Sequence, residues 1–467
     1  MKCLCFFRYN NTMRREELFK NRRAVLVIAM ILIAFLLSLF IFRSELPDRS
    51  KQYPLFELDG NWTITKNGER LPERDLYRLE TPGVLYGDKW VLETKLPSDN
   101  VARISGAALY FHTLQSAVRV SVGGEEIYTY GTDRYAERRM LKRGICLIPL
   151  PDSYPGKDLR IEITASEPIA FNGLGPILFG NEEELFLHFM ELRRVPLFLG
   201  VFLCIYALFQ MFFLPILLAD MRRLLTPLIG SLLSLTMGLY ILCYYYLVGI
   251  MTRLENLNTF LEYLTLYLLP LCFSIYLYTV LGGRLKKLYQ FFAELDAGLL
   301  FAALMLHVMN LAHITLYLQF FYIITFLESA PYLIGARGYI RRQQEIMPDT
   351  LSHVARIIVY FGFFIYLVCS LLDTVMYAYA KFIGGAEPEH GIPFFSTGAI
   401  VFTLSVTIQY FLQGISHLRA DVIKQRLEER AYTDGLTGLA NRTRCELEMQ
   451  KMTVAEPFVI ISMDVDN

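Results

Sequence analysis

Long apolar runs separated by short polar connections dominate the chain beyond residue 193. Seven of these runs lie near residues 195–219, 224–250, 260–282, 289–309, 313–335, 353–379 and 393–416. About 20 apolar residues in a helix cross the hydrocarbon core of a bilayer, and each run reaches that length. The pattern therefore predicts an all-α bundle of seven transmembrane helices over residues 193–416.

An eighth apolar run, Ala24–Phe42, follows an N-terminal segment rich in Arg and Lys. No small-residue cleavage site follows this run, so we predict an uncleaved signal anchor over residues 24–43. Basic connections such as Asp220–Arg223 alternate along the bundle with connections poor in Lys and Arg. By the positive-inside rule this alternation places residues 1–23 and the C-terminal segment in the cytoplasm, and residues 44–190 outside.

Residues 44–190 show a different pattern, in which apolar and polar residues alternate over short stretches such as Ala117–Val122. Turn signals, among them Asn67-Gly68 and Gly123-Gly124, separate these stretches. Several short strands with this spacing favour an all-β sandwich. Trp62 and Trp90 lie in strand-like surroundings, where they either pack in the core or stack on a bound ligand such as a sugar.

The composition adds two points to this picture. The chain has 467 residues, of which 54% are hydrophobic, and its formal net charge is zero. Because the basic residues gather beside the apolar runs, charge offers no argument for binding nucleic acid. Cys146 is the only cysteine of the segment predicted to be extracellular, so that segment cannot hold an internal disulfide.

Acidic residues inside the predicted spans are candidates for ligand contact or signal relay, because an ionisable group at membrane depth is costly. These candidates are Asp296, Glu328 and Asp373. Each could instead be paired inside the bundle or lie near an interface. Pairing is the simpler interpretation for Glu262, because it lies at the start of its span.

The pieces Leu58–Trp62, Ala108–Phe111 and Val120–Ile127 occur in an order that resembles the galactose-binding-like jelly roll found at the front of many glycosidases. That resemblance implies that the domain over 44–190 binds an extracellular small molecule or glycan. A β-domain followed by seven spans also resembles the bacterial seven-transmembrane receptors with diverse intracellular signalling modules. This family implies a multi-pass receptor in the bacterial plasma membrane.

Two motifs carry the chemistry of residues 433–467. The apolar run Phe458–Met463 ends in Asp464-Val465-Asp466, and carboxylates two residues apart in a strand share a face where they could hold Mg²⁺. The earlier motif reads DxLTGLxNR at Asp434, Leu436, Thr437, Gly438, Leu439, Asn441 and Arg442.

Together these motifs resemble the opening of the GGDEF domain, the α/β catalytic domain of diguanylate cyclases. The resemblance implies that Asp464 and the carbonyl of Val465 hold Mg²⁺, with Asp466 as a further candidate, while two GTP molecules form cyclic di-GMP. The glycine-rich turn and the triphosphate-binding lysine of that family would follow Asn467. We therefore expect a truncated GGDEF domain here, and no cyclic di-GMP synthesis by the chain as given.

Residues 417–432 have apolar residues at helical spacing among charged ones and predict a signalling helix. This helix could form a parallel coiled coil in a homodimer or stand alone as a solvated helix. A non-enzymatic receptor, or a partner that dampens full-length copies, is the alternative to a cyclase-coupled receptor. The ligand, the sign of regulation and the domain that binds the ligand stay open at this stage.

Overall fold

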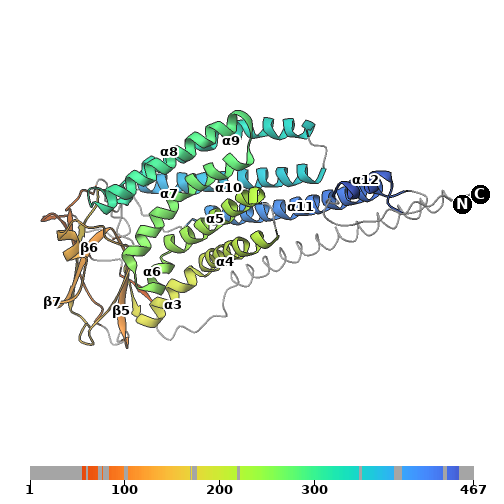
Figure 1. The fold of residues 1–467 in the computed structure, drawn as a ribbon. Helices are drawn as coiled ribbons and strands as arrows, with labels where there is room; N and C mark the ends of the chain where they lie inside the picture. The colour runs from red at the N-terminus through yellow and green to blue at the C-terminus, as the bar shows by residue number, and fades with distance from the viewer. Residues whose placement is uncertain are drawn as a thin grey trace, which may run out of the picture.

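The computed structural model describes residues 55–58, 62–71, 76, 84–98, 104–168, 170, 176–217, 221–346, 350–382, 392–434 and 439–451. The anchor predicted over 24–43 lies outside these residues, as does the Asp464–Asp466 motif. The described residues form a β-sheet region followed by long helices, which fits a multidomain membrane protein (Figure 1).

Two antiparallel sheets make up the N-terminal region, here called the β-domain. The smaller sheet has the order β1 (Phe56–Glu57), β10 (Leu178–Asn181), β5 (Ala107–Leu114) and β8 (Arg143–Pro149). The larger sheet has the order β3 (Glu69–Arg70), β2 (Thr63–Lys66), β4 (Lys89–Lys95), β9 (Asp158–Ala165), β6 (Ser116–Val122) and β7 (Glu125–Tyr130). The two glycine-containing turn signals join β2 to β3 and β6 to β7, with positive φ at both central residues, as tight hairpins require.

A single core lies between these sheets, and it contains both tryptophans of the β-domain. Trp62 and Trp90 are 0% and 2% exposed, and they pack with residues such as Leu109 and Phe179. The Trp62 indole donates a hydrogen bond to the carbonyl of Leu58 at 2.7 Å. Full burial of a large apolar side chain contributes about 3 kcal/mol. Neither ring offers a face to a sugar in this arrangement, so packing is the role that their positions favour.

Seven helices in the described part of the chain are long and apolar enough to cross a membrane, which confirms the prediction of seven spans. They are α4 (Arg194–Leu217), α5 (Met221–Tyr244), α7 (Glu255–Val280), α8 (Gly283–Val308), α9 (Leu318–Ile346), α10 (Thr350–Phe382) and α11 (Pro393–Tyr432). The fifth span begins in the short 3-10 helix η3 (Ile314–Tyr317). Inside the bundle, aromatic rings such as Phe273, Tyr366 and Phe402 pack together, while many outer apolar side chains are exposed, as contact with lipid allows.

The second and third spans differ from their predicted limits, because the chain breaks where it meets the β-domain. The second span ends at Tyr244, and Tyr246 adopts a left-handed conformation with φ 65° before the short helix α6 (Leu247–Thr252). The third begins at Glu255, ahead of the apolar run that predicted it. Its polar first turns contact the β-domain, which apolar spacing alone could not indicate.

Helices α3 (Glu182–Leu192) and α11 connect the parts of the chain. Helix α3 joins the β-domain to α4, and the Asn181 side chain caps it by accepting hydrogen bonds from the Glu183 and Glu184 amides. Helix α11 continues without a break from the last span through the predicted linker over 417–432. Figure 1 shows the β-domain at one end of the bundle, and α12 (Arg442–Lys451) beyond the other end.

Candidate ligand-binding site between the β-domain and the helices

The β-domain is seated on the ends of the helices by an apolar cluster. Tyr246 and Leu247 pack against Ile145 of β8 and Phe189 of α3. The Tyr246 ring lies directly over the backbone of Gly144, where a Cβ atom would overlap the ring. Glycine at this position therefore permits the close approach of β8 and the start of α6.

Ion pairs cross the same junction. The Lys142 Nζ atom lies 2.6 Å from Glu255 Oε2 and also donates to the Ile145 carbonyl at 3.2 Å. Arg143 pairs with Glu262, and its amide donates to the Thr259 hydroxyl at 2.9 Å. Because residues 255, 259 and 262 follow helical spacing, one face of α7 receives the β8 strand.

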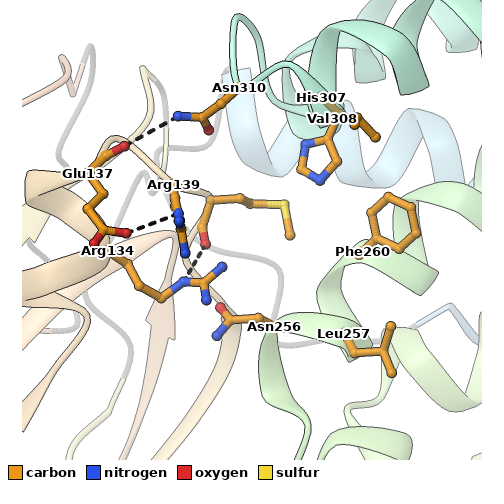
Figure 2. A pocket seen from close by; sticks show the side chains of 10 residues that line it. Arg134, Glu137, Arg139, Asn256, Leu257, Phe260, His307, Val308 and Asn310 are labelled. Atoms are coloured by element: carbon orange, nitrogen blue, oxygen red, sulfur yellow. Dashed lines mark hydrogen bonds and ion pairs between the residues drawn. The ribbon is translucent and has the colours of Figure 1, made fainter.

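A cavity of about 680 Å³ lies beside these contacts, with walls from both parts of the chain (Figure 2). The β-domain contributes residues from α2 (Thr132–Ala136) and the segment after it, and the helices contribute the first turns of α7 and the end of α8. The lining residues are Arg134, Glu137, Arg139, Met140, Asn256, Leu257, Phe260, His307, Val308 and Asn310. Pockets that bind small molecules have volumes in this range.

Polar groups occupy the β-domain side of the cavity. The Arg134 Nε donates to the Met140 carbonyl at 3.3 Å, and Arg139 pairs with Glu137 at 3.0 Å. The Asn310 amide reaches across from the helices and donates to the Glu137 carbonyl at 3.3 Å. Two arginines and one glutamate leave an excess of positive charge on this wall, which favours an anionic group in the ligand.

Apolar side chains, among them Leu257, Phe260 and Val308, lie on the opposite wall beside the polar Asn256 and His307. The Phe260 ring stacks on the His307 imidazole, with centroids 5.3 Å apart and planes 20° apart, and Leu257 lies nearby on α7 (Figure 2). A cavity with one basic wall and one aromatic wall suits a small molecule that carries both an acidic group and an apolar part.

A histidine ties the connection between α8 and η3 to the β-domain at the edge of this cavity. The His313 Nδ1 contacts the buried carboxylate of Glu167, and its Nε2 lies 3.0 Å from the Arg138 carbonyl. Burial lowers the pKa of His313, but the hydrogen bond and charge of Glu167 outweigh burial, so its pKa is raised above the ordinary value.

This contact predicts a pH-dependent junction. Because the pKa of His313 is higher in the folded protein than in the unfolded chain, its contact with Glu167 stabilises the fold fully at a pH below about 6.5, the pKa of an unfolded histidine. This contribution is lost as the pH rises through the pKa that His313 has in the folded protein. We expect thermal unfolding to show wild type more stable than His313→Gln by about 1.5 kcal/mol at pH 6, with the difference shrinking toward pH 8.5. Glu167→Gln should flatten the profile in the same way, and parallel profiles for wild type and His313→Gln would contradict the assignment.

The acidic residues predicted inside the spans have different surroundings. Asp296 of α8 and Glu328 of α9 are buried and face each other in the bundle. Asp373 of α10 accepts a hydrogen bond from the Phe395 amide, so its carboxylate provides a partner for a backbone N–H group in the first turn of α11. Glu262 is paired, as described above, which is the simpler of the two roles expected for it.

The motif after α11 is only partly described, because Leu436, Thr437 and Gly438 lie outside the described residues. The Asp434 amide donates to the Leu439 carbonyl at 2.8 Å, and Thr433 and Ala440 form an antiparallel bridge. The Asn441 side chain accepts a hydrogen bond from the Arg444 amide at 3.1 Å and caps α12, which begins at Arg442. Within the described ranges no group of three or more His, Cys, Asp and Glu side chains could hold a metal ion.

The lining residues of the cavity were not found from the sequence. A signal was present, because basic residues gather between Arg134 and Arg143 in the β-domain while Glu255 and Glu262 open a predicted span. Opposite charges in two separate parts of a chain indicate that the parts could meet. They do not indicate which pairs form, and the cavity results from how those pairs set the two parts.

Comparisons with known proteins do not assign the chain to a family. No protein-family model matches the chain, and no curated protein matches it. Among solved structures, the chain is similar to an FMN-binding β-glucuronidase from Facaelibacterium prausnitzii L2-6, with 18% sequence identity and a TM-score of 0.20. The similarity covers 27% of this chain and 22% of the glucuronidase. A likeness this weak carries no argument about fold or function.

Proposed function

We propose that this protein is a membrane signal receptor in which a small extracellular ligand binds between the β-domain and the seven-helix bundle. The observation that supports the proposal best is the cavity with walls from both parts. A ligand that contacts both walls stabilises their docked arrangement relative to any other arrangement. Binding would thus act directly on α7 and α8, whose outer ends form the helical wall.

The ligand expected for this cavity is a small amphipathic acid, including an acidic sugar, because the cavity combines a basic wall with an aromatic one. In this proposal the β-domain faces the outside of a bacterial plasma membrane, and both termini face the cytoplasm. Nucleic acid is not a partner of this site. A ligand that contacts only one wall would bind equally well however the β-domain and the helices are arranged. Signalling by this mechanism therefore requires a ligand that contacts both the Arg139 wall and the Phe260 wall.

The output is proposed to be a cytoplasmic diguanylate cyclase domain, because residues 433–467 resemble the opening of such a domain. Helix α11 supports this, because it runs continuously from the last span to Tyr432, directly before the motif that begins at Asp434. Its exposed Val422, Ile423 and Leu427 could pair with a second copy in a homodimer, which would bring two GTP sites together. Mg²⁺ would be held in that domain at Asp464, Val465 and Asp466. The alternative remains a receptor without enzyme activity.

Binding to the cavity can be tested on the full chain in lipid nanodiscs by thermal unfolding with benzoate, hexanoate and gluconate. We expect at least one of these acids to raise the melting temperature saturably, and Arg139→Met to weaken its apparent affinity about tenfold, as loss of a charged contact does. Arg119→Met is the matched control, because Arg119 is an exposed, ion-paired arginine on β6 that does not line the cavity. Equal shifts in wild type and Arg139→Met, or none with any acid, would reject the proposed site.

A further inference from the structure

Three polar side chains meet inside the bundle, away from the cavity. Ser274 of α7, Asp296 of α8 and Glu328 of α9 are 1%, 0% and 6% exposed. The two carboxyl groups face each other, and the Ser274 hydroxyl faces Glu328. Asp296 lies near the midpoint of the α8 span, so the cluster sits deep in the proposed membrane.

The oxygens of this cluster lack hydrogen-bond donors from the surrounding helices, which buried polar atoms normally have. Among the described residues outside this cluster, no group donates a hydrogen bond to Ser274 Oγ, either carboxyl oxygen of Asp296 or Glu328 Oε1. Ionised carboxylates only accept hydrogen bonds, so the two acids cannot satisfy each other unless they share a proton. Tyr289 cannot supply the missing donor, because its hydroxyl already donates to the Glu328 backbone carbonyl at 2.8 Å.

The charge of the pair also requires compensation. Two carboxylates in contact in a medium of low dielectric constant cannot both stay ionised, so one proton is held by the pair. With a single proton on the pair one negative charge remains, and within the described chain the groups that act on either carboxyl include no Lys, Arg or His. A monovalent cation neutralises that charge and accepts the free oxygens as ligands, whereas Ca²⁺ prefers six to eight oxygens.

We propose that Ser274, Asp296 and Glu328 form an intramembrane Na⁺ site, with one proton retained on the carboxyl pair. The hydroxyl and the Asp296 carboxylate supply ligand oxygens, and protonated Glu328 supplies a neutral one. Bound Na⁺ ties α7, α8 and α9 together. Since α7 and α8 also carry the helical wall of the cavity, the ion stabilises the arrangement of helices that supports that wall.

The test is equilibrium binding of ²²Na⁺ to the full chain in detergent micelles at pH 7.5, with choline as the replacing cation. We expect saturable binding by wild type, at least a tenfold loss of affinity in Asp296→Asn and a smaller loss in Ser274→Ala. Glu294→Gln is the matched control and should bind as wild type, because Glu294 lies on α8 but is exposed and bonded to Gln290.

Absence of saturable ²²Na⁺ binding by wild type would overturn the site, and it is also the result expected if two protons neutralise the pair. Unchanged affinity in Asp296→Asn would overturn it as well. Gel filtration and thermal unfolding check that each variant is folded. If Asp296→Asn does not fold, wild type and Ser274→Ala still test the proposal. Equal affinity for Na⁺ in wild type and Ser274→Ala would reject the proposed ligand set.

Discussion

Replacing Glu255 with alanine should lower the free energy of unfolding by about 3 kcal/mol, because it leaves a buried charge without its partner. The Lys142 side chain is only 1% exposed, and Glu255 is the one carboxylate paired with it among the described residues. The Ile145 carbonyl at 3.2 Å and the Tyr130 ring at 4.3 Å remain, but neither carries a full negative charge. Thermal unfolding of the full chain in nanodiscs measures the change.

Lys142→Met provides the matched comparison, because it removes the same ion pair from the other side. The Glu255 side chain is 36% exposed and can be hydrated once its partner is gone, so we expect a cost of about 1 kcal/mol or less. In the Lys142→Met background, Glu255→Ala should cost far less than in wild type, since no buried ammonium remains. Equal costs for the two single variants would mean that the burial of Lys142 does not govern the junction.

The spans were predictable because each property that defines them is local. Length and apolar composition decide whether a segment such as Pro393–Leu412 can cross a membrane, and both are read from consecutive residues. The hairpin at Asn67-Gly68 and the cap at Asn441 were predictable for the same reason, because positive φ and amide capping depend on one or two residues.

The candidate sites were less predictable, because they depend on contacts between distant residues. Asp296 and Glu328 were each recognised as costly, but their pairing depends on how α8 and α9 are rotated against each other. Lys142 and Glu255 are 113 residues apart, and their contact depends on the seating of the whole β-domain. Composition restricts which residues can pair, and only the packed structure selects among them.

Gly144→Ala should weaken the seating of the β-domain, although it adds only one methyl group. Strand β8 passes so close to α6 that the new Cβ would overlap the Tyr246 ring. Tyr246 is 5% exposed and packs among Ile145, Leu247 and Phe189, so the ring has little room to move away. Forcing an extra methyl group into a packed region costs about 3 kcal/mol when the neighbours cannot move. Thermal unfolding and limited proteolysis of the full chain measure the loss of stability and of docking.

A double-mutant cycle separates this clash from a general intolerance of alanine in β8. Tyr246→Ala removes the ring and is itself destabilising, because it leaves a cavity in the junction. In that background Gly144→Ala should be nearly neutral, since the added methyl group then fills part of the cavity. The coupling energy should therefore be about 3 kcal/mol in favour of the double variant. A Gly144→Ala cost that stays the same without the Tyr246 ring would show that the strand, and not its contact with α6, requires glycine.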